Sequence, residues 1–138
     1  MLTQTTRYGF STAVAKPFEE AVERTRAELA REGFGVLTEI DVKATLKRKL
    51  DVDFRPYVIL GACNPPFAYR ALHAERDIGL LLPCNVVVYA ADEPGGSVVA
   101  AMDPEAALQL ADNPALGEVA LEVKSRLQRA LKRVAGEE

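Results

Sequence analysis

Residues 57–69 read YVILGACNPPFAY and contain the junction that decides the fold. The stretch YVILGA is almost continuously apolar, as expected of a strand that is buried on both faces. The pair Asn64-Pro65 then predicts the start of a helix. Asparagine accepts hydrogen bonds from free amides there, and proline has no amide hydrogen to leave unpaired. Cys63 lies between these two elements, at the end of the strand.

A second cysteine-asparagine pair follows in residues 78–90, which read IGLLLPCNVVVYA. Cys84 comes directly after Pro83, and the apolar run NVVVYA predicts another strand that is buried on both faces. The chain has no further cysteine besides Cys63 and Cys84. The sequence therefore raises the question of whether the two thiols belong to one site.

Two segments nearer the N-terminus instead alternate in side-chain character from one residue to the next. Residues 7–14 and 34–42 have the period of two that is typical of strands. Between them, apolar residues recur at helical spacing from Pro17 to Gly33, where glycine is expected to end the helix. The stretch KATLKRKL at residues 43–50 predicts a short exposed helix.

The C-terminal third predicts one more strand and a long helix. The turn DEPGG leads into the strand SVVAAM at residues 97–102. Asp103-Pro104 and Asn113-Pro114 each combine a capping side chain with a proline. The second of these pairs is expected to open a long amphipathic helix.

These elements predict one α+β domain that spans residues 1–138. A largely antiparallel sheet of about five strands packs against two amphipathic helices in two layers, in the order β-α-β-β-α-β-β-α with short extra helices. Two helices on one side leave the second face of the apolar strands uncovered. Either the short central helix or a second subunit covers that face, and we expect a homodimer because twofold dimers are the commonest soluble assemblies.

Composition and charge argue against several kinds of partner. The net charge is −3 and the pI is about 5.3, so no positive field attracts nucleic acid. The longest apolar stretch, about fourteen residues from Ile78, is interrupted at Pro83, whereas a membrane-spanning helix needs about 20. The chain starts without an apolar leader, so we expect a cytoplasmic protein with reduced cysteines.

Cys63 is the main candidate functional residue. The N-terminal end of a helix carries partial positive charge, which stabilises a thiolate and lowers the pKa of a nearby cysteine. A thiolate at Cys63 is expected to act as a nucleophile, an oxidation sensor or a soft-metal ligand. The alternative is that Cys63 is a small buried hydrophobe where helix and sheet pack closely.

The orientation of the two apolar strands decides whether Cys63 and Cys84 share a site. Parallel strands place them about 15–20 Å apart at about 3.3 Å per residue, whereas antiparallel strands bring them close. The spacing leaves both arrangements open. We expect no metal site and no cofactor, because the chain has no C-x-x-C pair and its one histidine, His73, lies far along the helix from Cys63.

Three segments of the chain resemble those of a bacterial and archaeal family known as domain of unknown function 302. They are DVKATLKRKL (41–50), LGACNPP (60–66) and LLLPCNVVVY (80–89), and the resemblance runs from about Tyr8 to Val134. It implies a small two-layer α+β domain that assembles from identical subunits and has no established activity. The characteristic motifs of the family are Cys-Asn-Pro and Leu-Pro-Cys. The positions carried over are therefore Cys63, Asn64, Pro65, Pro83 and Cys84.

Three functions remain open. The first is a homodimeric module that binds a small ligand or responds to redox state through Cys63. The second is a thiol-dependent enzyme in which Cys63 attacks an electrophile, although no nearby base in the sequence supports this chemistry. The third is a structural interaction domain in which both cysteines are buried and inert.

Overall fold

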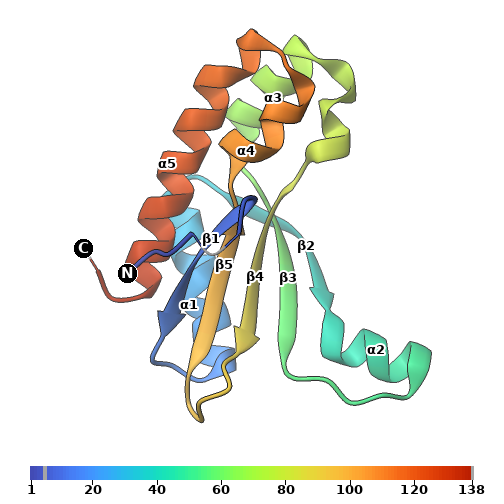
Figure 1. Ribbon diagram of the computed structural model, residues 1–138, viewed down its shortest axis with the longest axis vertical. Coiled ribbons are helices and arrows are strands. Elements are labelled where there is room, and N and C mark those ends of the chain that lie inside the picture. Colours follow the sequence, from blue (N-terminus) through green and yellow to red (C-terminus); the bar gives the residue numbers. More distant parts are fainter. Residues whose placement is uncertain (5, 138) are drawn as a thin grey trace.

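The chain folds into one antiparallel sheet with two long helices against it (Figure 1). The computed structural model describes residues 1–4 and 6–137. Its strands are β1 (Gly9–Val14), β2 (Gly35–Asp41), β3 (Tyr57–Cys63), β4 (Cys84–Ala90) and β5 (Ser97–Met102). Its helices are α1 (Phe18–Arg31), α2 (Val42–Leu50), α3 (Pro65–Ala74), α4 (Pro104–Leu108) and α5 (Gly117–Val134), with 3-10 turns η1 (Arg76–Leu81), η2 (Gln109–Ala111) and η3 (Pro114–Leu116).

The sheet has the strand order β1-β5-β4-β3-β2, and every neighbouring pair is antiparallel. The predicted α+β fold and element order are therefore confirmed. In the pair β3–β4, Ala62 lies opposite Cys84. The two cysteines consequently lie at the same end of the sheet, which selects the antiparallel alternative that the spacing left open.

Helices α1 and α5 cover one face of the sheet (Figure 1). Alternate residues of the central strands, such as Leu60, Val86 and Val99, are fully buried beneath them. The stripe predicted for the long helix faces the sheet as expected. Its buried members are Leu116, Ala120, Val123, Leu127, Ala130 and Val134.

Buried ion pairs join α1 to α5. Glu28 is 3% exposed and accepts a hydrogen bond from Arg133 Nε at 2.8 Å. Glu32 accepts a hydrogen bond from Arg129 at 3.0 Å and another from Arg133. Burial by itself raises the pKa of Glu32, but the hydrogen bonds from the two arginines outweigh it and lower that pKa below its ordinary value. The ionised carboxylate of Glu32 therefore stabilises the contact between the two helices.

The long helix begins later than the sequence predicts. The side chain of Asn113 accepts a hydrogen bond from the Ala115 amide at 3.0 Å, as a capping residue does. Residues Pro114–Leu116 nevertheless form the 3-10 turn η3, and α5 begins at Gly117. A tight 3-10 turn is a frequent first step into an α-helix, so the cap is confirmed and the start of the helix shifts by one turn.

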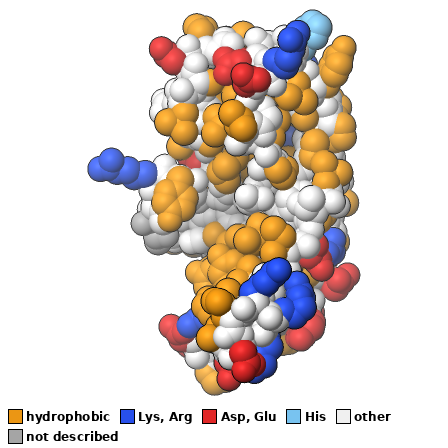
Figure 2. Space-filling view, turned by 90° about the vertical axis from the view of Figure 1, so that its right-hand side faces the viewer, with side chains coloured by type: hydrophobic (Ala, Val, Ile, Leu, Met, Phe, Trp, Pro, Cys, Tyr) orange, Lys and Arg blue, Asp and Glu red, His pale blue; other side chains and the backbone are white. Residues whose placement is uncertain are grey.

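The opposite face of the sheet, which we call the open face, is not covered by any helix of the described residues (Figure 1). Its central residues Ile59, Val87 and Val98 are only half-buried. Helix α2 extends away from the β2 edge and buries none of its residues. Figure 2 shows it as a separate lobe with charged side chains on its outer side. No helix in residues 1–4 and 6–137 has the length and apolar character needed to span a membrane.

Candidate functional site

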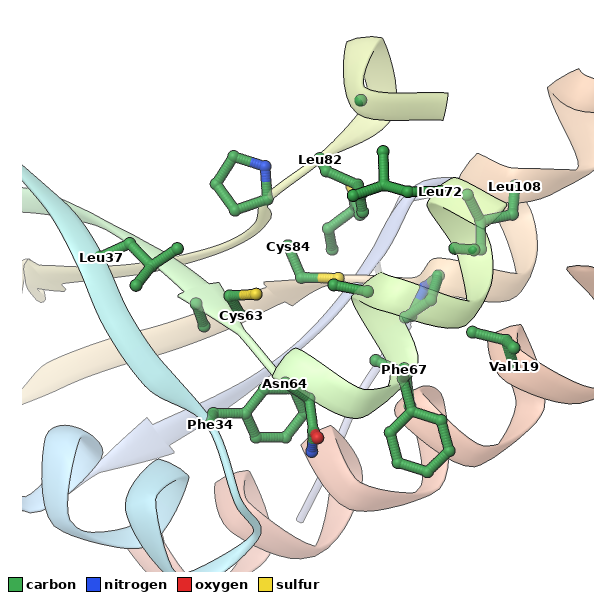
Figure 3. Close-up of a pocket in the computed structure, with 18 of the residues that line it drawn as sticks. Phe34, Leu37, Cys63, Asn64, Phe67, Leu72, Leu82, Cys84, Leu108 and Val119 are labelled. Atoms are coloured by element: carbon green, nitrogen blue, oxygen red, sulfur yellow. The ribbon is translucent and has the colours of Figure 1, made fainter. Parts of the chain in front are cut away.

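A cavity of about 330 Å³ lies at the end of β3 and β4, beside α3 (Figure 3). Its walls come from segments that are far apart in the sequence, including α3, α4, α5 and the ends of three strands. None of the described residues that line it carries a charge, and only Thr38 and Asn64 have amide or hydroxyl side chains. The larger apolar walls are Phe34, Phe67, Leu72, Leu82, Leu108 and Val119.

Cys63 and Cys84 both line this cavity, and both are free thiols. Their strands are neighbours, and Cys84 pairs with the residue directly before Cys63. Cys84 is buried against the core, whereas Cys63 is half-buried at the end of its strand. The sheet therefore brings the two thiols into one site, and Figure 3 shows both sulfur atoms pointing toward α3.

Burial in the cavity disfavours the thiolate form of both cysteines. Burial raises the pKa of the Cys63 thiol above its ordinary value. Burial, together with the nearby Cys63 thiol, raises the pKa of Cys84 to about 11. The prediction that the start of α3 lowers the pKa of Cys63 is therefore wrong.

The first turn of α3 carries little partial positive charge because its first two residues are prolines. Pro65 and Pro66 have no amide hydrogen, so two of the free amides that give a helix its positive end are missing. The Ala68 amide donates to the Asn64 carbonyl at 2.9 Å, which leaves at most the Phe67 amide free in this turn. The prolines that mark the helix start thus also remove the donors that stabilise a thiolate.

The side chain of Asn64 does not cap α3, in contrast to the sequence prediction. Asn64 occupies the capping position, but its Nδ2 donates to the Glu32 carbonyl oxygen at 3.0 Å and makes no hydrogen bond to the first amides of the helix. Arg126 donates to the same carbonyl at 3.2 Å, and its guanidinium lies over the ring of Phe67 at 5.3 Å. Asn64 therefore ties the start of α3 to the end of α1 and fixes one wall of the cavity.

The sequence model of the family described as domain of unknown function DUF302 matches residues 10–134 of the chain. The chain belongs to the DUF302 family. It is also similar to a solved structure, the crystal structure of uncharacterized conserved protein DUF302 from Bacillus stearothermophilus. The two are 35% identical with a TM-score of 0.84, over 94% of this chain and 99% of that one. No curated protein matches the chain.

The remaining motif residues of this DUF302 chain lie on both sides of the cavity. Pro83 forms part of its wall, and Pro65 is an exposed residue in the first turn of α3. A Cβ atom on Gly61 would lie only 2.9 Å from Cγ of Pro83, so the absence of a side chain at Gly61 lets the segment before β4 approach β3. Of the five motif positions, Cys63, Asn64, Pro83 and Cys84 thus meet at the cavity, whereas Pro65 only starts the helix beside it.

Sequence reasoning missed most of the apolar wall of this DUF302 cavity. Residues such as Leu72, Leu108 and Val119 have the helical spacing of ordinary core residues, and nothing in that spacing shows that a space remains between them. Within the described part of the chain, no group of three His, Cys, Asp or Glu residues is placed to hold a metal ion. His73 is exposed, and its ring lies 5.9 Å from that of Tyr69.

Proposed function

We propose that this DUF302 chain is a small-ligand-binding module whose cavity takes a small, neutral, apolar molecule. The observation that supports the proposal is the cavity of about 330 Å³, whose described walls include no charged residue. A charged ligand there would lose its hydration without gaining a partner, which costs several kcal/mol. An apolar molecule loses nothing of this kind and gains contacts with the apolar walls.

The volume indicates the size of the ligand. Ligand pockets in proteins span roughly 300–1,000 Å³, and an apolar cavity of about 150 Å³ is large enough for benzene. The present cavity therefore suits a molecule of one or two rings or a short hydrocarbon chain. Cys63 and Cys84 form part of its wall as neutral thiols.

The thiol-dependent alternatives have less support. A cysteine nucleophile or oxidation sensor reacts as its thiolate, and the raised pKa values of Cys63 and Cys84 reduce the thiolate at neutral pH. The cavity side chains include no histidine, lysine or carboxylate within the described residues that could act as a base for Cys63. The geometry therefore favours binding over catalysis.

We also propose that the chain is a cytoplasmic homodimer that folds as one unit. The half-buried apolar side chains of the open face support the dimer, because a face of this kind is stabilised by a second subunit. The two free thiols are compatible with a reducing compartment. A single hydrophobic core that includes strands and helices from both halves of the chain supports one folding unit.

The ligand proposal is tested with a neutral fluorescent probe, N-phenyl-1-naphthylamine, whose emission rises in apolar surroundings. The chain has no tryptophan that would obscure the signal. We expect saturable binding that is weakened at least about tenfold by Ala68→Phe, which fills the cavity from α3. Ala74→Phe, an exposed position on the same helix, is the matched control and should bind as the wild type does.

Two results would contradict the ligand proposal. One is the absence of saturable probe binding to the folded wild-type chain. The other is equal affinity in Ala68→Phe and the wild type, since the probe would then bind elsewhere. Circular dichroism of both variants establishes that each one is folded.

A further inference from the structure

The open face of the sheet carries an apolar surface that is separate from the cavity. Strand pairing places Ile40, Ile59, Val87 and Ala100 in one row across four strands. The row ends at Ser11 on β1 and includes no charged residue. The neighbouring row passes through Tyr57 on β3 and Tyr89 on β4, which lie opposite each other, and it also includes no charged residue.

A groove of about 410 Å³, which we call the tyrosine groove, lies on this face. Tyr8, Tyr57 and Tyr89 line it beside Val87 and Ala100. The rings of Tyr57 and Tyr89 stack with their centres 5.2 Å apart. Tyrosine is enriched at protein interfaces because its ring buries apolar area while its hydroxyl stays hydrogen-bonded. The groove therefore has the side chains of a protein-binding surface.

The α2 arm, which we define as residues 42–56, carries a second exposed apolar surface. Leu50, Val52 and Phe54 are 66%, 44% and 42% exposed. The ring of Phe54 lies 6.1 Å from that of Tyr57, so the apolar surface of the arm continues into the tyrosine groove. One chain thus presents both a projection with exposed apolar side chains and a hollow lined by tyrosine rings and apolar side chains, and neither is covered by the rest of the described residues.

We propose that the partner of this surface is a second copy of the chain, and that each α2 arm packs over the tyrosine groove of the other copy. Leu50, Val52 and Phe54 of one copy are the side chains that enter the groove of its partner. The arrangement is isologous, because the same two surfaces meet twice about one twofold axis. This inference rests on the homodimer proposed above and assigns its interface.

Charge and position favour a second copy with its twofold axis parallel to the strands. In Figure 1, the α2 arm and the turn between β4 and β5 lie at the same end of the sheet. A twofold rotation about such an axis places the arm of one copy, which extends from its β2 edge, over the β1–β5 side of the other copy. The arm then lies at the end of the sheet where the β4–β5 turn of that other copy is. The basic residues Arg48 and Lys49 of the arm then approach the turn of the partner, which carries Glu93 and also Asp92, the ion-pair partner of Arg55 in its own copy.

A lipid surface fits the arm less well. Lys47 forms ion pairs with Asp51 at 3.1 Å and Asp53 at 3.6 Å, so the outer side of the arm carries both signs of charge. Anionic membranes attract segments with an excess of basic residues, and the two aspartates reduce that excess. A protein surface with an acidic turn at its rim matches the mixed charge better.

The test measures the dimer dissociation constant by sedimentation velocity over a concentration series. We expect Leu50→Glu to raise this constant by about thirtyfold or more, the effect of losing an interface hot spot. Leu121→Glu is the matched control, because Leu121 is 55% exposed on α5, on the other side of the sheet. It should leave the dissociation constant unchanged. Since both leucines are exposed in the single chain, neither change should prevent folding.

A second measurement locates the contact. In a chain with Cys63→Ser and Cys84→Ser, the pair Phe54→Cys and Ala100→Cys should form a disulfide between two copies on mild oxidation. A wild-type chain that is monomeric at every concentration overturns both the homodimer and its interface. A wild-type dimer that is unchanged by Leu50→Glu and gives no linked copies overturns the interface alone and leaves the homodimer standing.

Discussion

The cavity and the tyrosine groove are hollows of similar size, about 330 and 410 Å³, in two parts of the same sheet. The cavity is walled by helices at the end of the strands. Apart from Thr38 and Asn64, apolar carbon and two neutral thiols line it. The groove lies on the open face and includes tyrosine hydroxyls and the side chains of Ser11 and Asn85. Size alone therefore does not decide what a hollow binds. The lining of the cavity suits a small neutral molecule, and the lining of the tyrosine groove suits a protein surface.

The largest expected effect comes from placing a carboxylate in each hollow. Val123→Asp, in the cavity wall on α5, should lower the free energy of unfolding by about 3 kcal/mol or more, because the charge has no partner there. Val87→Asp, in the groove, should cost less than about 1 kcal/mol in the single chain, where water reaches it. Urea denaturation in dilute solution compares the two. Equal losses of unfolding free energy in the two variants would show that water reaches the cavity and the groove equally well, which would contradict the comparison.

A smaller effect is expected from adding one methyl group beside the cavity. Gly61→Ala places a Cβ atom against Oγ1 of Thr38, its nearest neighbour, and 2.9 Å from Cγ of Pro83, so both of these cavity-lining side chains must move. We expect a loss of about 2 kcal/mol of unfolding free energy and weaker probe binding. Gly35→Ala in β2 is the matched control, since its Cβ atom meets no other atom within 4 Å. Probe affinity that is unchanged in a stable Gly61→Ala variant would place the ligand elsewhere.

The smallest effect concerns the ion pairs behind the cavity and depends on pH. The pKa of Glu32 is lowered in the folded chain, so its ionised form adds stability above the unfolded pKa, and this stability is lost as the pH falls through the folded value. Glu32→Gln should therefore cost about 1–2 kcal/mol at neutral pH, and the difference should shrink below about pH 4. Thermal denaturation at several pH values measures it.

The control for this ion pair lies at the start of α1. Glu20 pairs with Lys16 at 3.4 Å, but its side chain is 60% exposed. Glu20→Gln should change stability little, because solvent screens an exposed pair. A loss for Glu32→Gln that does not vary with pH would mean that its carboxylate contributes through shape alone.

The sequence predicted the fold because the two strand periods and the proline-marked helix starts follow local rules. The stripe from Ala120 to Val134 needs only helical spacing to be recognised, and the apolar strands β3 and β4 indicate an open face that lacks cover. The start of α5 was misplaced by one turn because capping by Asn113 does not distinguish a 3-10 turn from an α-helix.

The chemistry of the site was predicted less well than its location. The Cys-Asn-Pro and Leu-Pro-Cys motifs do mark the cavity, but asparagine carries both a donor and an acceptor, and the sequence does not show that Asn64 uses its donor on Glu32. The sequence also does not show the space between Leu72, Leu108 and Val119, since a cavity depends on how side chains from distant segments fill the volume. The effect of Pro65 and Pro66 on the helix charge could have been read from the sequence alone.

The most direct test of the apolar cavity is the rate of iodoacetamide alkylation at Cys63 as a function of pH, with and without N-phenyl-1-naphthylamine. The structure predicts an apparent pKa above the ordinary value of about 8.5 and slower alkylation when the probe is bound. Cys63→Ala removes the signal and serves as the control. A rate that is already maximal at neutral pH and is unaffected by the probe would contradict the account.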